Sequence, residues 1–262
     1  MQKKQGISGS TLKIMALIFM VIDHTAAILL PPVLEKYGVT WLGNLSMEYM
    51  RELLLEGYVG WIYILYQVMR RVLGRLAFPI YCFLLVEGFE KTRNRVKYAG
   101  RLLLFALISE VPFNFAFRGK AFDISYQNVF FTLLLGFLMI WMMEAVEKYF
   151  LPEEKRGGMW RLLAAITGEA AVFLLAGLAA EFIKCDYGAH GTIAIGLLYF
   201  FRKNKVEQMI AGCVAFFWEI TAMFSFVFIG FYNGKRGIRL KYVFYIFYPA
   251  HLLVLYLISR NL

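Results

Sequence analysis

An adjacent aspartate and histidine interrupt the first apolar stretch of the chain. Asp23 and His24 lie within the run from Leu12 to Leu30, and Lys13 stands eleven residues before His24. Eleven helical steps of about 100° return a side chain to nearly the same face, about 16 Å further along the axis. A lysine can bind phosphate and an imidazole can act as a general base. The spacing therefore suits a long phosphate-headed cofactor lying along the helix. The simpler alternative is a membrane anchor at Lys13 and a packed core histidine.

Two further ionisable residues lie inside other apolar runs. His251 stands in FYPAHLLVLYL near the C-terminus, and Arg75 stands in GRLAFP. An ionisable side chain at the centre of a membrane helix costs about 2.5–3.5 kcal/mol by insertion scales, so each is a candidate for function. Adjacent residues on a helix do not face each other, so Asp23 is expected to pair with a donor from another helix. Arg75 is a candidate for that donor, or for binding phosphate.

A second group of polar residues lies near helix boundaries. Glu110 stands in SEVPFNF, Asn128 begins an apolar run, and Asp186 and Tyr187 belong to the glycine-rich CDYGAHG. Helix capping is the simpler interpretation of Asn128, and a surface turn is the simpler interpretation of Asp186 and Tyr187. These structural roles stand beside a role in binding a substrate.

The elements that must position these residues are set by composition. The chain has 262 residues, of which 60% are apolar and 18% charged, with a mean hydropathy of +0.61. A soluble domain is nearer half apolar and a quarter charged, so this class is excluded, as are disordered and disulfide-rich chains. The net charge of +10 comes from basic clusters between apolar runs, a pattern that argues against nucleic-acid binding. The composition predicts an all-α, polytopic transmembrane helix bundle.

The apolar runs predict eight or nine membrane-spanning helices in one integral-membrane domain over residues 1–262. Pro31-Pro32 is expected to end the first helix, residues 58–71 to form an interfacial or half-inserted helix, and Pro79 to kink the following span at 72–89. The run 207–231 is either one span or two short helices broken near Trp218-Glu219. The remaining spans are expected at about 101–117, 127–147, 162–183, 188–201 and 242–258.

The basic residues predict how the chain is oriented. Residues 1–11, 90–101, 148–161 and 202–205 hold 14 lysines and arginines, whereas residues 31–57, 118–126 and 184–187 hold five. Loops rich in lysine and arginine remain on the cytosolic side of membranes. The N-terminus is therefore expected in the cytosol, with the protein in a bacterial inner (plasma) membrane. Lys235 and Arg236 join the cytosolic set only if two helices precede them.

Several segments together resemble the TraX family of membrane proteins. They are ISGSTLKIMALIFMVIDHTA, GRLAFPIYCFLLVEGF, LISEVPFNFAF, QNVFFTLLLGF, DYGAHG, YNGKRG and FYPAHLLVLY, and they occur in this order over nearly the whole chain. That family is similar to a wider group of transmembrane acyltransferases with a basic residue, ten others and a histidine on the first helix. Lys13 and His24 fit this spacing, with lysine where arginine is usual.

The resemblance implies acetyl transfer from cytosolic acetyl-CoA to an amine, such as the N-terminus of a pilin in a conjugation system, or to a hydroxyl of a glycan- or lipid-linked acceptor. His24 is expected to act as general base, with Asp23 and His251 completing the catalytic set. Acetyl-CoA is the expected co-substrate, without a metal. The cations expected to bind it are Lys13, Arg75, Arg93, Arg95, Arg101, Lys235 and Arg236. The residues expected near the acceptor are Glu110, Asn128, Asp186 and Tyr187.

Several alternatives remain open from the sequence. His251, Asn128 or Arg75 can each stabilise the oxyanion that forms when the thioester is attacked. Transfer of the acetyl group is either direct or through an acetyl-histidine. A proton-coupled small-molecule transporter would use Asp23, Glu110 and His251 as a relay. A non-catalytic assembly factor of a conjugation apparatus would use none of this chemistry. Membrane lipids are expected partners in every case.

Overall fold

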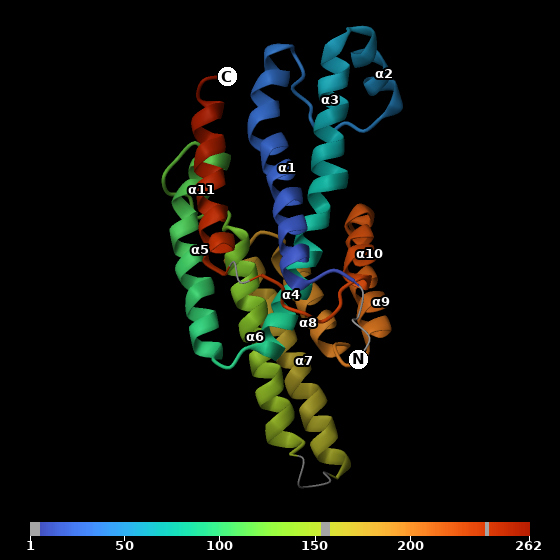
Figure 1. Ribbon diagram of the computed structural model, residues 1–262, viewed down its shortest axis with the longest axis vertical. Coiled ribbons are helices and arrows are strands. Elements are labelled where there is room, and N and C mark those ends of the chain that lie inside the picture. Colours follow the sequence, from blue (N-terminus) through green and yellow to red (C-terminus); the bar gives the residue numbers. More distant parts are fainter. Residues whose placement is uncertain (1–5, 153–157, 239–240) are drawn as a thin grey trace. The chain divides into compact units, whose positions relative to one another are not determined.

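A computed structural model describes residues 6–152, 158–238 and 241–262 (Figure 1). Lys3 and Lys4 of the predicted cytosolic segment, and Lys155 and Arg156, lie outside these ranges. The described residues form helices and turns, with two isolated β-bridges and no strand among them. The predicted all-α class is therefore confirmed.

Among the described residues, six helical segments are long and apolar enough to cross a membrane. Two shorter apolar helices, Gly188–Phe200 and Ile220–Gly230, accompany them. Such helices suit a membrane because they satisfy every backbone polar group internally. The length and composition of these helices are therefore those of a polytopic helical membrane protein. The long segments are α1 (Gly9–Lys36), the continuous run Tyr58–Lys91, α5 (Arg95–Arg118), α6 (Val129–Phe150), α7 (Met159–Phe182) and α11 (Lys241–Ser259).

The chain divides into two compact units. The first contains residues up to Tyr81 together with Val111–Phe122 and Glu219–Leu262, and the second contains Cys82–Glu110 and Asp123–Trp218. In the first unit α11 packs along α1 in the same direction, because Lys13 approaches Phe244 and His24 approaches His251 (Figure 1). The first unit therefore brings the first and last helices of the sequence side by side.

Helix α1 begins at the cap Ser8, whose hydroxyl accepts from the backbone N–H of Thr11, and it runs through Pro31 and Pro32 to Lys36. The prediction that the two prolines end this helix is wrong. Each proline removes one backbone hydrogen bond, but the turn that follows is held by packing. Leu34 is fully buried there, in a cluster with Val39, Leu53, Val59 and Tyr63. The short helix α2 (Met47–Leu55) supplies Leu53 to this cluster.

The segment predicted as a half-inserted helix followed by a separate span is one helical run. It contains α3 (Tyr58–Val68), a π-helical turn (Met69–Leu73), a 3-10 turn (Gly74–Leu76) and α4 (Ala77–Lys91). Pro79 has no N–H for the carbonyl of Arg75, which loosens the turn before it. The irregularity therefore lies just before Pro79.

The run 207–231 contains two short helices. Helix α9 (Lys205–Ala215) ends before residues 216–219, and a 3-10 turn (Ile220–Phe224) leads into α10 (Ser225–Gly230). Of the two alternatives left open by the sequence, the break near Trp218-Glu219 is confirmed.

In the second unit, small residues let helices approach closely. Gly136 of α6 lies against Ile195 of α8 (Gly188–Phe200), and Gly196 of α8 lies against Phe173 of α7. Small residues at such crossings are typical of membrane helix packing.

Candidate functional site

The candidate site is centred on two histidines from opposite ends of the sequence. Nδ1 of His24 on α1 lies 2.7 Å from Nε2 of His251 on α11. Their rings are nearly parallel, at 8°, with centroids 5.0 Å apart. The other nitrogen of His251, Nδ1, lies 2.9 Å from the backbone carbonyl oxygen of Phe247. The two histidines thus form a hydrogen-bonded chain that ends on a carbonyl group.

Aromatic side chains enclose this pair. The rings of Phe117 and Tyr248 meet His24 edge-on, at centroid distances of 5.7 and 5.9 Å. His251 is buried at 8% exposure, while His24 is half-buried. Apolar walls strengthen hydrogen bonds between the polar groups that they surround.

Asp23 pairs with a donor from another helix, as predicted, but the donor is Arg70. Nη1 of Arg70 lies 2.6 Å from Oδ2 of Asp23. Arg75 instead pairs with Glu219, at 3.3 Å. Of the two candidate roles predicted for Arg75, a hydrogen bond to Asp23 is therefore not observed, although the two charges interact. The π-helical turn at Met69–Leu73 carries Arg70, and a turn of this kind changes the direction in which side chains project.

A glycine makes room for this ion pair. A Cβ atom on Gly74 would overlap the carboxylate of Asp23. The 3-10 turn that contains Gly74 can therefore approach α1 closely only because the residue has no side chain.

Three of the predicted phosphate-binding cations gather at the start of α1. The backbone N–H of Gly9 donates to the carbonyl of Lys235 (2.8 Å), and that of Ser10 donates to the carbonyl of Arg236 (2.9 Å). These bonds place the loop that contains Lys235 and Arg236, here called the cationic loop, beside the first turn of the helix. Lys13 follows one turn later, close enough to Arg236 for the two charges to interact. Like charges held together repel each other, so a bound anion would stabilise this cluster.

The shape of the loop depends on Gly237. Its φ of +74° is in the left-handed region, and an added Cβ would overlap the hydroxyl oxygens of Ser8 and Ser10. Ser10 Oγ accepts from the N–H of Ile238 at 3.0 Å. The loop is thus attached to α1 mainly through backbone groups.

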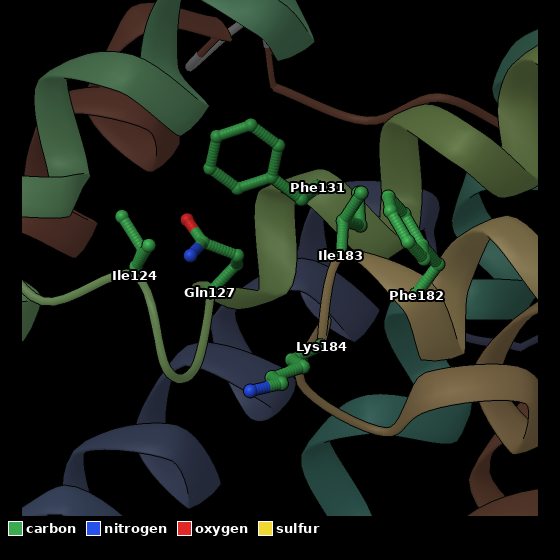
Figure 2. Close-up of a pocket in the computed structure, with 6 residues that line it drawn as sticks. All are labelled: Ile124, Gln127, Phe131, Phe182, Ile183 and Lys184. Atoms are coloured by element: carbon green, nitrogen blue, oxygen red, sulfur yellow. The ribbon is translucent and has the colours of Figure 1, made fainter.

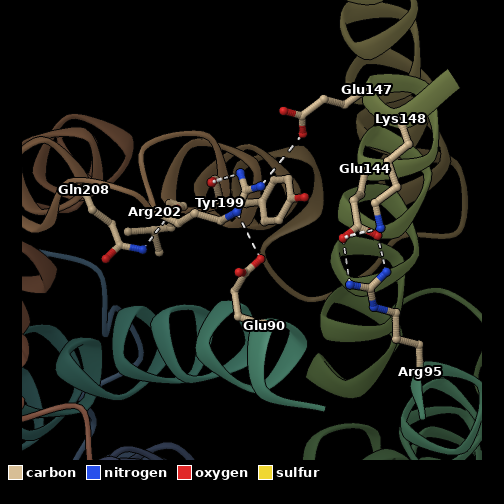
Figure 3. Close-up of polar contacts among 9 residues, drawn as sticks. Glu90, Arg95, Glu144, Glu147, Lys148, Tyr199, Arg202 and Gln208 are labelled. Atoms are coloured by element: carbon tan, nitrogen blue, oxygen red, sulfur yellow. Dashed lines mark hydrogen bonds and ion pairs between the residues drawn. The ribbon is translucent and has the colours of Figure 1, made fainter. Parts of the chain in front are cut away.

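The other predicted cations belong to the second unit, except Arg75. Arg95 makes two hydrogen bonds to Glu144, one of 2.8 Å (Figure 3). Its guanidinium also stands 4.0 Å from the ring centroid of Phe89. Phosphate binding by Arg95 would require this ion pair to open. Arg93 is exposed between α4 and α5, and the guanidinium of Arg101 stands 5.4 Å from the ring centroid of Tyr98.

A second ion-pair group lies nearby in this unit. Arg202 pairs with Glu90 at 3.0 Å and lies over the ring of Tyr199, 3.7 Å from its centroid (Figure 3). Glu144 and Arg202 were not singled out by sequence, since acids and bases at helix ends carry no pattern that distinguishes a pair.

The residues predicted near an acceptor form a polar network in the second unit. Asn128 caps α6 through Phe130 N–H and donates to Glu110 Oε2 at 2.6 Å. Asp186 Oδ1 accepts from the hydroxyl of Tyr126 at 2.6 Å. Tyr187 has a left-handed backbone, with φ of +64°. Asn128 therefore has the structural role that the sequence offered as an alternative, and it also contacts Glu110.

A pocket of about 400 Å³ opens beside this network (Figure 2). Within the described chain, none of the predicted site residues lines it. The adjacent thiol of Cys185 is buried, and burial raises its pKa to about 12. The pocket wall is formed by Ile124, Gln127, Phe131, Phe182, Ile183 and Lys184.

The described residues include no group of three histidines, cysteines or carboxylates placed to hold a metal ion. The groups that the structure places at the candidate site are the two imidazoles, with the ion pair of Asp23 and Arg70 beside them and the cations at the start of α1.

The chain is similar to known proteins over nearly its whole length. The family model described as TraX protein matches residues 8–259. A protein of Dichelobacter nodosus, "Probable fimbrial assembly protein FimC, serogroup H1", is 26% identical over 285 residues, which cover 97% of each chain. No solved structure matches the chain.

Proposed function

The chain belongs to the TraX family, and on this premise we propose that it is an integral-membrane acetyltransferase. It moves the acetyl group of acetyl-CoA to an amine, with the N-terminus of a pilin or fimbrial subunit as the first acceptor to test. The name of the Dichelobacter nodosus relative as a fimbrial assembly protein supports that choice. The protein acts in the cell membrane, with the start of α1 on the cytosolic side.

The observation that carries this proposal is the arrangement along α1. Lys13, Lys235 and Arg236 gather at its first turns, and the histidine pair lies eleven residues further on, about 16 Å along the axis. The phosphates of CoA need cationic partners, and its slender pantetheine arm can descend between helices where the charged nucleotide cannot. The thioester would then lie near His24.

The reaction needs one base and one place for negative charge. His24 takes a proton from the acceptor amine as the nitrogen attacks the thioester carbonyl carbon. The C–N bond forms and the C–S bond breaks. The thiolate of CoA leaves and receives the proton back from His24, giving free CoA and the acetylated amine. Arg70 holds Asp23 in place beside the base, and its positive charge favours negative charge developing on the carbonyl oxygen.

The direct test is acetyl transfer by the purified protein in lipid nanodiscs. Isotope-labelled acetyl-CoA is supplied with a peptide that has a free N-terminal amine. We expect labelled acetyl on the peptide by mass spectrometry, with one CoA thiol released per peptide. His24→Gln is expected to lower the rate at least 100-fold, since general base catalysis contributes about 10²–10⁴-fold.

The chain offers a matched control for that substitution. His190 is exposed in the second unit and its ring lies tilted against that of Trp218, so His190→Gln should leave the rate unchanged. Equal rates for both variants and the unchanged protein would contradict the proposed role of His24.

A non-catalytic assembly role is the second candidate, and the relative's name as an assembly protein supports it. The two candidates differ in whether acetyl-CoA binds. An acetyltransferase gains thermal stability as acetyl-CoA rises above its Kd, because the ligand binds only the folded state. An assembly factor, or a transporter of another solute, shows no such shift.

A further inference from the structure

We infer that His251 is a positioning residue that fixes the tautomer of His24 and shares the proton that His24 accepts. The inference rests on the proposed function only for its effect on turnover. The tautomer itself is a property of the hydrogen-bonded chain and is measurable without substrate.

The end of the chain determines where each proton lies. The carbonyl oxygen of Phe247 can only accept a hydrogen bond, so Nδ1 of His251, 2.9 Å away, carries a proton. A neutral imidazole has one N–H, so Nε2 of His251 is then an acceptor. The contact of 2.7 Å between this nitrogen and Nδ1 of His24 requires a donor, and that donor is the N–H of His24.

The remaining nitrogen of His24 is therefore the basic one. In neutral His24 with a proton on Nδ1, Nε2 holds the lone pair. No hydrogen-bond partner is found for this atom among the described residues. His24 thus presents one defined nitrogen to a substrate, and without the contact to His251 either tautomer would be available.

The same contact stabilises the charge that forms during turnover. When Nε2 of His24 takes a proton from the amine, its ring becomes an imidazolium with two N–H groups. The Nδ1 proton then lies between two imidazole nitrogens 2.7 Å apart, and it can move to Nε2 of His251 without any other group reacting. Because Nδ1 of His251 is bonded to a carbonyl, the proton goes no further. It returns to Nδ1 of His24 as Nε2 gives its own proton to the departing thiolate of CoA, so the pair ends the cycle as it began.

Packing holds His251 in the orientation that this requires. The ring of Phe247 stacks on that of His251 at 12°, with centroids 5.2 Å apart, and Tyr248 meets it at 5.6 Å. All three residues lie within five consecutive positions of α11. The arrangement resembles the use of a second group to orient a catalytic histidine, where presentation of the wrong tautomer lowers kcat by about 10⁴-fold.

The tautomer is tested by nitrogen NMR of the protein labelled with ¹⁵N-histidine in nanodiscs. The chain has three histidines, so single substitutions assign every signal. We expect His24 protonated at Nδ1 and bare at Nε2, with a coupling across the hydrogen bond to His251. A proton on Nε2 of His24 would overturn the inference.

Two substitutions separate orientation from proton sharing. His251→Leu removes the acceptor. We then expect mixed tautomers at His24 and a transfer rate that falls by at least about 100-fold. His251→Gln retains an oxygen that accepts from Nδ1 of His24 but cannot take the proton. It should keep the tautomer and recover about tenfold of the rate. Equal rates and equal spectra for the two variants would overturn the inference.

Failure of the proposed function would look different. If the unchanged protein shows the expected tautomer but transfers acetyl to no amine, the tautomer assignment stands and the acetyltransferase proposal falls. If the protein transfers acetyl while His251→Leu keeps both its rate and the tautomer of His24, the acetyltransferase proposal stands and the role of His251 falls.

Discussion

Substitution of Gly237 should separate the cationic loop from α1. In Gly237→Ala the new Cβ would overlap the hydroxyls of Ser8 and Ser10, so the loop must move away. The move breaks three hydrogen bonds, from Gly9 to Lys235, from Ser10 to Arg236 and from Ile238 to Ser10. Each contributes about 0.5–1.5 kcal/mol, or about 1.5–4.5 kcal/mol together. Left-handed strain adds about 1–2 kcal/mol.

Gly234 provides the matched control for this substitution. Its φ of +79° is nearly that of Gly237, but an added Cβ there meets nothing within 4 Å. Gly234→Ala should therefore lose only the strain, about 1–2 kcal/mol. The free energy of unfolding is measured by SDS titration in mixed micelles, and acetyl-CoA affinity by calorimetry. Equal losses of stability in the two variants, or unchanged affinity in Gly237→Ala, would refute the attachment of the loop as the basis of the cationic site.

Three further predictions concern the charges around α1. Lys13→Ala should raise the Kd for CoA about tenfold, the equivalent of one charge-assisted hydrogen bond, whereas His24→Ala should spare the Kd and remove turnover; calorimetry and the transfer assay measure the two. In a topology assay, Lys4→Cys should react with an impermeant maleimide only from the cytosolic side and Lys36→Cys only from the opposite side, because the distribution of 14 basic residues against five predicts a cytosolic N-terminus. Gly74→Ala should separate Asp23 from its guanidinium partner. The free energy of unfolding, measured by SDS titration, should fall by about 3 kcal/mol, the lower end of the range typical of a broken buried pair.

Each of these has an outcome that contradicts it. Equal loss of CoA affinity in the Lys13 and His24 variants would end the division between binding and catalysis. Labelling of Lys4→Cys from outside intact cells would reverse the topology. For Gly74→Ala the control is Gly100→Ala in α5, where a Cβ meets nothing within 4 Å and alanine favours the helix by about 1 kcal/mol. If Gly74→Ala gained as much stability as Gly100→Ala, the close approach of the turn at Gly74 to α1 would be excluded.

The long helices could be predicted from sequence because a membrane allows few alternatives to a helix of about 20 apolar residues. The points at which helices end or run into one another could not be predicted from sequence. Pro31 and Pro32 each remove a hydrogen bond, and whether the helix survives depends on what its last turn packs against. That depends on the burial of Leu34 against Tyr63 and its neighbours, residues whose proximity no local pattern reveals.

The candidate site shows the same division. The spacing of Lys13 and His24 follows from the period of a helix, so their stripe was predictable from the sequence. The partner of Asp23 was not, because a π-helical turn alters the phase between Arg70 and Arg75. Nor was the contact between His24 and His251, since residues 227 positions apart meet only through the packing of whole helices.

The way in which the cationic loop is attached explains why its charges and its shape can serve separate purposes. Carbonyls of Lys235 and Arg236, rather than their side chains, receive the N–H groups of α1. Those N–H groups would otherwise lack partners at the start of a helix, so the loop completes the helix while leaving both cationic side chains exposed. Glycine at 237 permits the close approach. The side chains are thus free to meet an anion at the start of α1, the helix that carries the histidine base further along its length.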